Sequence, residues 1–332
     1  MSVFRIVVPD DSPPVYGEAP AALAPLNAYG EVLVYGSRAA DREELLARLA
    51  GAQVAINIRT YTVFDAALLD RLPDLQLISI LGTGTDNVDL VAAAERGVVV
   101  TNAPGASTDS VAEMALYLML AAARQVPAME RRLRAGEWQH RKGFELRGKT
   151  LGVVGLGAIG QAVARLGRGL GMEVLAWSFH QDPERARACG AEPAELDDLL
   201  RRADVVSLHL RASAEANNII GAAQLALMKP TAILVNTARG ALVDEEALAQ
   251  ALREGRLFAA GLDAYRREPL PADSPLRDME NVVLAPHAGW VTYEASARLE
   301  QLPVENVIAY LEGRPQNVVN PNALAHPRHR RG

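Results

Sequence analysis

Three glycines, Gly155, Gly157 and Gly160, form a GxGxxG pattern whose spacing suits the binding of a dinucleotide. In such a motif one glycine permits a tight turn, the second lets the backbone approach the pyrophosphate, and the third lets a helix pack close to a strand. The first turn of the helix offers free N–H groups and a partial positive charge to the phosphates. Glycine-rich turns are common, so the flanking elements decide how the motif is interpreted.

Those flanking elements lie between residues 149 and 178. An apolar strand over 151–154 precedes the glycines, a helix over 158–170 follows them, and a second apolar strand covers 172–177. This is the context that the motif requires. We therefore predict a dinucleotide site at the glycine turn, with Ala158 and Ile159 at the helix N-terminus as part of it.

The composition is that of a globular protein with no signal for nucleic acid or membrane. The 332 residues, at a prior of about 150 per domain, predict two domains. A net charge of -6 gives no basic surface for nucleic acid, and the single Cys189 excludes an intramolecular disulfide and argues against a cysteine-rich metal site. The start of the chain lacks the pattern of a signal peptide, and the longest apolar run, 114–123, has about half the length needed to span a bilayer. We expect a cytoplasmic protein without a bound metal.

The first hundred residues alternate short apolar runs with helical patterns. The strand candidates are FRIVVP, EVLVY, QVAINI, LQLISIL and GVVVT. Such alternation predicts a parallel sheet covered on both sides. At the end of LQLISIL, the loop GTGTDNVD over 82–89 is placed where ligands bind in open α/β sheets, and it could present N–H groups to an anion. An ordinary turn before a helix is an equal alternative.

The second half of the chain is organised around a longer series of strands. NAPGAS marks a boundary, and the following helix, in which Ser110 and Glu113 have capping-box spacing, is apolar nearly all round and is predicted to be buried between the two halves. Four strand candidates follow the first two, ADVVSLHL, TAILVNTA, LFAAGLDAY and NVVLAPH, so that six strands form a doubly wound domain. Beyond residue 287 an amphipathic helix is expected to return to the first domain.

Several motifs stand together as they do in one family. GTGTDNVD, NAPG with VAE, LRGKTLGVVGLGAIG, MKPTAILVNTARGALVDEEAL, GLDAYRREPL and APHAGW resemble the D-isomer-specific 2-hydroxyacid dehydrogenases over almost the whole chain. The resemblance implies an α/β fold with a Rossmann dinucleotide-binding domain, 103–287, inserted into a flavodoxin-like substrate-binding domain, 1–102 plus 288–332. It also implies a homodimer that transfers a hydride between NAD(P)H and C2 of a small 2-oxo acid, as glyoxylate and hydroxypyruvate reductases do.

The resemblance assigns catalytic roles to three residues. Arg239 matches the arginine that binds the substrate, and a guanidinium can pair with a carboxylate and polarise the neighbouring carbonyl. His287 matches the acid/base, because reduction of a 2-oxo acid needs a proton for the new alkoxide. Alone, a histidine at a strand end is more often structural. Glu268 matches its carboxylate partner, whose charge favours the imidazolium.

Other residues are assigned to the cofactor or the substrate by the same resemblance. Asp263 matches the residue that accepts a hydrogen bond from the nicotinamide carboxamide, although a helix cap at the end of a strand is an alternative. The backbone N–H groups of Thr83 and Gly84 would bind the substrate carboxylate, with Arg59 as a weaker candidate. The remaining candidates are His180, His209 and Thr237 for the cofactor and Trp290 for the substrate.

Departures from the family pattern leave cofactor and substrate open. Ser178 stands where an acidic residue would hold the ribose 2′-hydroxyl, and the next arginines, Arg185 and Arg187, come several residues later. NAD is slightly favoured over NADP. Arg211 and Asn217 replace a usual proline and threonine.

Three rival functions share this fold. Formate dehydrogenases carry a glutamine where Glu268 stands, so the carboxylate argues against that activity. A phosphite-oxidising enzyme stays open. An NADH-sensing corepressor that binds peptides is the alternative from outside enzymology.

Overall fold

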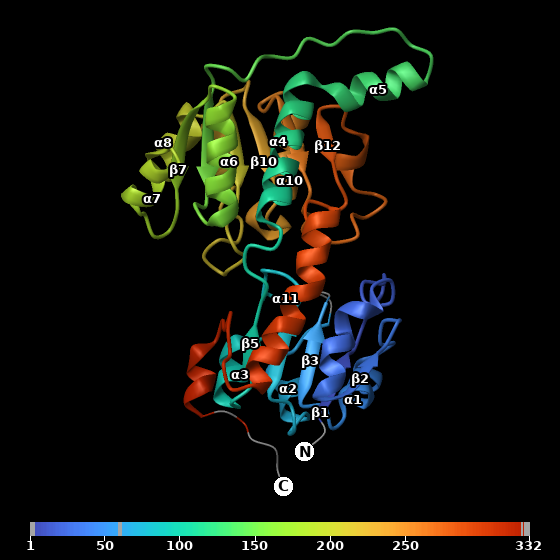
Figure 1. Ribbon diagram of the computed structural model, residues 1–332. Coiled ribbons are helices and arrows are strands. Elements are labelled where there is room, and N and C mark those ends of the chain that lie inside the picture. The colour runs from blue at the N-terminus through green and yellow to red at the C-terminus, as the bar shows by residue number, and fades with distance from the viewer. Residues whose placement is uncertain (1–3, 59–61, 327, 329–332) are drawn as a thin grey trace. The chain divides into compact units, whose positions relative to one another are not determined.

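The computed structural model describes residues 4–58, 62–326 and 328. The chain divides into two compact units, one of residues 1–107 with 293–332 and the other of residues 108–292 (Figure 1). Each unit is an α/β structure built on a parallel sheet. The fold class predicted from the sequence is confirmed.

The smaller sheet has the flavodoxin-like strand order. Its five strands are all parallel and run in the order β2-β1-β3-β4-β5. The bounds are β1 Phe4–Val8, β2 Gly30–Val34, β3 Val54–Asn57, β4 Leu77–Ile80 and β5 Val99–Thr101. Every residue of β3, β4 and β5 is buried, as expected of strands that are covered on both faces.

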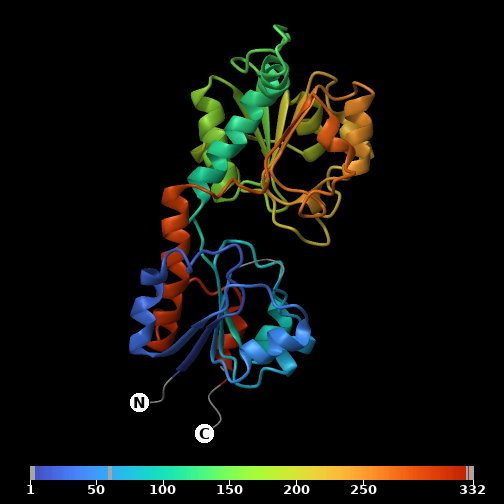
Figure 2. The ribbon, with the colours of Figure 1, turned by 90° about the vertical axis from the view of Figure 1, so that its right-hand side faces the viewer.

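Helices cover both faces of this sheet (Figure 2). One face carries the three helices α1 Arg42–Leu49, α2 Ala66–Asp70 and α3 Leu90–Glu95, whose leucines and alanines pack on the strands. The other carries the short helix η1 Pro20–Ala28 and the long helix α11 Tyr293–Leu311, which contacts β4 and η1. The hydroxyl of Ser79 donates to the carbonyl of Pro303 at 3.0 Å, so the C-terminal helix is tied to the centre of the sheet. A last turn, η4, covers Pro321–Ala325.

The larger sheet has seven parallel strands in the order β12-β11-β10-β9-β6-β7-β8. The bounds are β6 Thr150–Val154, β7 Glu173–Trp177, β8 Glu192–Pro193, β9 Val205–Leu208, β10 Ile233–Asn236, β11 Ala259–Leu262 and β12 Val282–Leu284. Counted from β6, the first six strands have the Rossmann order, and β12 extends the edge. The prediction of six strands was wrong by one, because two-residue β8 is too short to show any periodicity.

Two groups of helices enclose this sheet (Figure 2). On one face α4 Thr108–Arg124 packs against α6 Ala158–Gly169 and against β10 and β11. On the other face lie α8 Leu196–Arg202, α9 Ala222–Leu227 and α10 Glu245–Arg253. The remaining elements are α7 Pro183–Ala188, η2 Gly240–Leu242 and η3 Pro275–Asp278. The α10 helix ends at Arg253 with Glu254 as its C-cap residue, and Gly255, the glycine predicted as the C-cap, follows with a φ of +68°.

The helix α4 differs from its prediction in two respects. It begins at Thr108, so Ser110 lies buried inside the first turn, and the predicted capping box with Glu113 is wrong. The apolar pattern also predicted burial all round, yet Tyr117 and Leu120 are 55% and 39% exposed.

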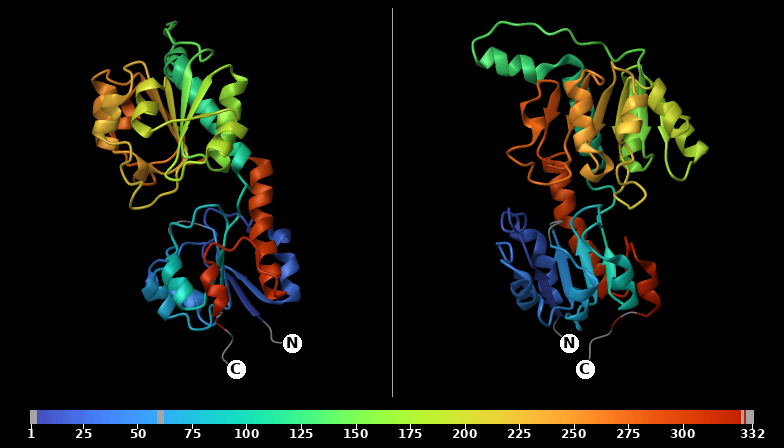
Figure 3. Two further views of the ribbon diagram at one scale, coloured as in Figure 1. Left: turned by 90° about the vertical axis from the view of Figure 1, so that its left-hand side faces the viewer. Right: turned by 180° about the vertical axis from the view of Figure 1, so that it is seen from behind.

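The segment after α4 projects beyond the end of the sheet (Figure 3). It consists of α5 Val126–Arg134 and a long loop to residue 149. Arg132 and Arg141 both pair with Glu280 and anchor this segment to its own unit. In the part of the chain that the structure describes, no helix has the length and apolar character needed to cross a membrane.

Candidate active site

The glycine turn after β6 has the geometry that its sequence predicts. Gly155 has a φ of +101°, and a Cβ there would lie 2.7 Å from the carbonyl carbon of His209. A Cβ on Gly160 would lie 2.0 Å from the carbonyl oxygen of Gly155. At Gly157 an added Cβ meets nothing within 4 Å, so this point of the turn is open. Two glycines therefore permit close packing, and the third exposes backbone to a ligand.

The surroundings of the turn fit a dinucleotide. The helix α6 begins at Ala158, and its N-cap residue, Gly157, has no side chain to satisfy the N–H groups of the first turn, which include that of Ile159. These groups suit a pyrophosphate. At the carboxyl end of β10, the hydroxyl oxygen of Thr237 is buried and finds no hydrogen-bond partner among the described residues. A buried hydroxyl without a partner is costly, and a bound cofactor would supply one.

His209 lies at the carboxyl end of β9, beside the glycine turn. Its Nε2 lies 2.9 Å from the hydroxyl of Ser207, and its backbone N–H donates to the carbonyl of Val154 at 2.7 Å. Burial of the ring lowers its pKa to about 3. The imidazole is therefore neutral at physiological pH, and it contributes shape and hydrogen bonding rather than positive charge.

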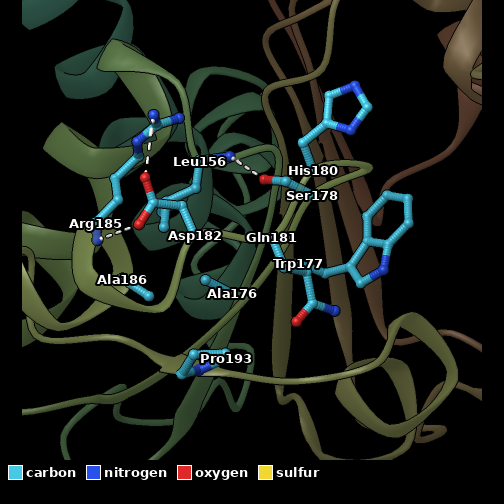
Figure 4. Close-up of a pocket in the computed structure, with 10 residues that line it drawn as sticks. All are labelled: Leu156, Ala176, Trp177, Ser178, His180, Gln181, Asp182, Arg185, Ala186 and Pro193. Carbon is cyan, nitrogen blue, oxygen red and sulfur yellow. Dashed lines mark hydrogen bonds and ion pairs between the residues drawn. The ribbon is translucent and has the colours of Figure 1, made fainter.

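A small pocket lies at the carboxyl end of β7 (Figure 4). The hydroxyl of Ser178 accepts a hydrogen bond from the backbone N–H of Leu156 at 2.8 Å, which joins the strand end to the glycine turn. Asp182 and Arg185 form an ion pair on the wall of this pocket, and His180 projects at its rim. Ser178 therefore occupies the end of the second strand of this sheet, the position at which Rossmann proteins carry the acidic residue that binds the ribose 2′-hydroxyl.

Glu268 and His287 form the hydrogen-bonded pair that the sequence reasoning predicted. The Nδ1 atom of His287 lies 3.0 and 2.8 Å from the two carboxylate oxygens of Glu268. Burial opposes ionisation of Glu268, but the hydrogen bond and charge of His287, the N–H of Tyr265 and the charge of Arg239 outweigh it. The pKa of Glu268 therefore lies below its ordinary value of 4.5. The carboxylate is ionised at neutral pH and faces the imidazole.

Arg239 belongs to the same cluster. It follows β10 directly, and the next residue, Gly240, packs so tightly that a Cβ would lie 1.8 Å from the carbonyl carbon of Tyr265. This close approach brings the loop after β10 against the loop that carries Glu268. Arg239 consequently acts electrostatically on Glu268. The loops after three neighbouring strands thus place Arg239 within electrostatic range of the Glu268–His287 pair.

Asp263 holds the turn that presents His287. Its two carboxylate oxygens accept the backbone N–H groups of Ala288 and Gly289 at 2.7 and 2.8 Å. His287, which directly precedes Ala288, has a φ of +55°, a left-handed conformation that is unfavourable for a residue with a side chain. No helix begins after Asp263 in the described structure, so the alternative of a helix cap was wrong. Burial raises the pKa of Asp263.

Tyr265 is a residue of the site that sequence reasoning missed. Its hydroxyl lies 2.8 Å from the carbonyl oxygen of Ala285 and 3.0 Å from that of Leu262, and its backbone N–H donates to Glu268 at 3.0 Å. It therefore links β11, the segment after β12 and the carboxylate. The one available signal was a phenol two residues after the aspartate of GLDAY.

The candidates for substrate binding are divided between the two units. In the smaller unit, Thr83 and Gly84 follow β4, and their backbone N–H groups have no acceptor among the described residues. The carbonyl of Thr83 accepts from the amide of Asn102 at 2.8 Å, which holds the loop. Arg59 lies outside the described residues. In the larger unit, Trp290 is partly buried in the tight turn after His287.

Comparison with known proteins agrees with this geometry. Residues 116–289 match the model of the D-isomer specific 2-hydroxyacid dehydrogenase NAD binding domain. A glyoxylate reductase of Aeropyrum pernix is 41% identical over 91% of this chain and 93% of its own length. A D-3-phosphoglycerate dehydrogenase of Methanocaldococcus jannaschii is 42% identical over 90% of this chain but only 57% of its own length. The crystal structure of a glyoxylate reductase from Paecilomyes thermophila superposes with a TM-score of 0.88, at 33% identity, over 96% of this chain and 99% of that one.

The predicted resemblance is therefore confirmed, and so is the predicted nicotinamide dinucleotide cofactor. The family model covers more than half of the chain, and the glyoxylate reductase of Aeropyrum pernix is 41% identical over 91% of it. The chain belongs to the D-isomer specific 2-hydroxyacid dehydrogenases, the NAD(P)-dependent oxidoreductases that transfer a hydride at C2 of a 2-hydroxy acid.

Proposed function

We propose that this enzyme reduces a small 2-oxo acid of the size of glyoxylate or hydroxypyruvate to the D-2-hydroxy acid. The observation that carries the proposal is the His287–Glu268 pair beside Arg239. A proton donor, a carboxylate that favours its charged form, and an anion-binding guanidinium are the groups that this reduction needs. The glyoxylate reductases among the relatives support the substrate class.

Each group has a separate task in the proposed reaction. Arg239 and the N–H groups of Thr83 and Gly84 bind the substrate carboxylate, with Trp290 beside the substrate and Arg59 as a further anion ligand. The bound nicotinamide supplies a hydride to the carbonyl carbon. Because Nδ1 of His287 faces Glu268, Nε2 is the atom that gives its proton to the new alkoxide. The neutral imidazole then recovers a proton from the solvent, so each turnover consumes one hydride and one proton.

The cofactor is held by the residues of the larger unit. We propose that the glycine turn, Ala158 and Ile159 bind the pyrophosphate and that Ser178 and His180 lie at the ribose. His209, Thr237 and Asp263 would line the path toward the nicotinamide. Asp263 already accepts two backbone N–H groups, so any bond to the carboxamide would be an additional one. We propose that residues 103–287 bind the nucleotide and that residues 1–102 plus 288–332 bind the substrate.

We also propose that NADH is the preferred cofactor. No arginine directly follows Ser178, and Arg185, the first described arginine that lines the pocket, is paired with Asp182. A guanidinium that is already paired attracts a 2′-phosphate less strongly.

The test is the initial rate of NADH and of NADPH oxidation with a series of 2-oxo acids. Glyoxylate, hydroxypyruvate, pyruvate and phenylpyruvate form a series of increasing size, and oxidation of 3-phosphoglycerate tests the activity named in the second group of relatives. We expect the largest kcat/KM for glyoxylate or hydroxypyruvate with NADH. Turnover only with phenylpyruvate or 3-phosphoglycerate would refute the proposed substrate. Binding of NADH without turnover of any acid would favour the sensing role.

We propose, in addition, that the enzyme is a cytoplasmic homodimer. Apolar side chains are exposed along α4, α5 and the following loop, and Trp138 is 80% exposed. The exposed set comprises Tyr117, Leu120, Val126, Leu133 and Trp138. Exposed apolar clusters of this kind mark interaction surfaces. Light scattering should give twice the mass of the chain, and Trp138→Glu should give the monomer mass. Cell fractionation tests the location.

A further inference from the structure

We propose that Asp182 determines the choice between NADH and NADPH in this enzyme. The inference rests on the proposed cofactor site and goes beyond it by naming a residue outside the glycine motif and outside the end of β7. Ser178 leaves the strand end without the acidic group that selects a free 2′-hydroxyl. The structure assigns that negative charge to Asp182, four residues later on the wall of the same pocket.

The contacts of Asp182 hold its carboxylate at this pocket. It is the N-cap residue of α7, and its Oδ1 accepts the backbone N–H of Arg185 at 2.9 Å. Its Oδ2 lies 3.3 Å from Nη2 of Arg185. Figure 4 shows the two side chains together on one side of the pocket, with the Ser178 hydroxyl and the Leu156 N–H beside them. The charge therefore has a defined place next to the glycine turn.

The charges around the pocket are nearly balanced. Among the described residues that line it, Asp182 is the only carboxylate and Arg185 the only arginine. The ion pair is exposed, with 50% of the Arg185 side chain and 41% of the Asp182 side chain accessible to solvent. A 2′-phosphate would meet the guanidinium only together with the carboxylate that repels it. NADH carries no charge at this point, so the repulsion acts on NADPH alone.

Removal of the Asp182 charge should therefore shift the cofactor preference toward NADPH, and removal of the Arg185 charge should shift it toward NADH. Asp182→Asn keeps an N-cap side chain for α7, so the helix is preserved. It leaves Arg185 available to the 2′-phosphate and should tighten NADPH binding about fivefold relative to NADH, an effect that salt reduces. Arg185→Gln leaves the carboxylate uncompensated and should weaken NADPH binding by about the same factor. The double variant should return close to the native ratio.

The experiment measures the dissociation constants of NADH and NADPH by nucleotide fluorescence, without any 2-oxo acid. Glu184→Gln is the matched control, because it removes one negative charge from the same exposed helix at a residue that does not line the pocket. We expect an unchanged NADH/NADPH ratio in this control and opposite shifts in the two single variants. Repeating the titrations at about 1 M salt should abolish most of both shifts.

Two results would overturn the inference. Equal NADH/NADPH ratios in native protein and Asp182→Asn, with both nucleotides bound, would show that Asp182 does not select the cofactor, and the proposed reduction would stand. A shift in Glu184→Gln as large as in Asp182→Asn would show that only the net charge matters. Conversely, the expected ratio shifts in an enzyme that turns over none of the 2-oxo acids would support Asp182 and refute the proposed reaction.

Discussion

Two carboxylates at strand ends of the same sheet are held in different ways. Asp263, after β11, is 2% exposed and binds two backbone N–H groups of the turn that carries His287. Asp182, after β7, pairs with a half-exposed Arg185. Buried, hydrogen-bonded groups are costly to disturb, whereas exposed ion pairs contribute about 0 to 1 kcal/mol. The groups proposed to perform the reaction are therefore held firmly, and the proposed selector of the cofactor can change without loss of the fold.

The largest effect should come from His287→Ala, in the turn that Asp263 holds. Without the imidazole, no described side chain at the dyad can replace it as proton donor, because Glu268 is ionised. We expect turnover of the 2-oxo acid to fall about a thousandfold. The dissociation constant of NADH should stay within about twofold, because the pocket after β7 and the glycine turn are untouched. Turnover within tenfold of the native rate would remove His287 from the mechanism.

Asp263→Ala should disturb the same end without touching the proton donor. Two N–H groups, the partly buried one of Ala288 and the buried one of Gly289, lose their acceptor, at a cost of about 1 to 3 kcal/mol for the buried one. The left-handed backbone at His287 also loses its support. We expect kcat to fall about a hundredfold and the melting temperature to fall as well.

The conservative variant Asp263→Asn separates positioning from stability. Its amide oxygen can accept one of the two N–H groups, so it should recover part of kcat and of the melting temperature. Equal kcat for native protein and Asp263→Ala would show that the turn at His287 needs no such support.

Glu268→Gln should reveal how the carboxylate sets the pH dependence. The pKa of Glu268 is lowered in the folded protein. The ionised carboxylate therefore stabilises the site at pH values above its ordinary pKa of 4.5, and this stabilisation is lost as the pH falls through the lower folded pKa. In the variant the amide carries no charge and does not titrate, so reduction should slow about tenfold at pH 7, and the decline of kcat that protonation of Glu268 causes at acidic pH should be absent. The measurement is kcat from about pH 3 to 7, and superimposable profiles would contradict the assignment.

The sequence predicts those parts of the site that depend on local pattern. The glycine turn was predictable because an apolar strand and a helix flank Gly155. Glu268 and His287 were predicted from the resemblance of their motifs to the family, because a histidine at a strand end is by itself more often structural. The role of Asp263 in holding the turn was not predictable, because its two partners lie 25 and 26 residues away. The capping box predicted at Ser110 was wrong for a local reason. The same spacing can occur inside the first turn of a helix, and α4 begins two residues earlier, at Thr108.

The pairing of Asp182 with Arg185, after β7, was likewise not predictable from the sequence. The missing acidic group at Ser178 is readable from the sequence, and so is the presence of Arg185. Where the replacement charge lies depends on the start of α7, which turns Asp182 back toward the pocket. Such short helices carry too few residues for their periodicity to fix a boundary.

The smallest predicted effect is that of Tyr265→Phe. This variant tests whether the phenol helps to position Glu268 and the turn that carries His287. The hydroxyl links the carbonyl groups of Leu262 and Ala285, but the backbone N–H that binds Glu268 is retained in the variant. We therefore expect kcat to fall about fivefold with KM and the NADH dissociation constant unchanged, because one hydrogen bond is worth about 1 kcal/mol. A purely structural role would lower the melting temperature and leave kcat unchanged. If kcat instead fell as far as in Asp263→Ala, the phenol rather than the aspartate would be the main support of the turn at His287.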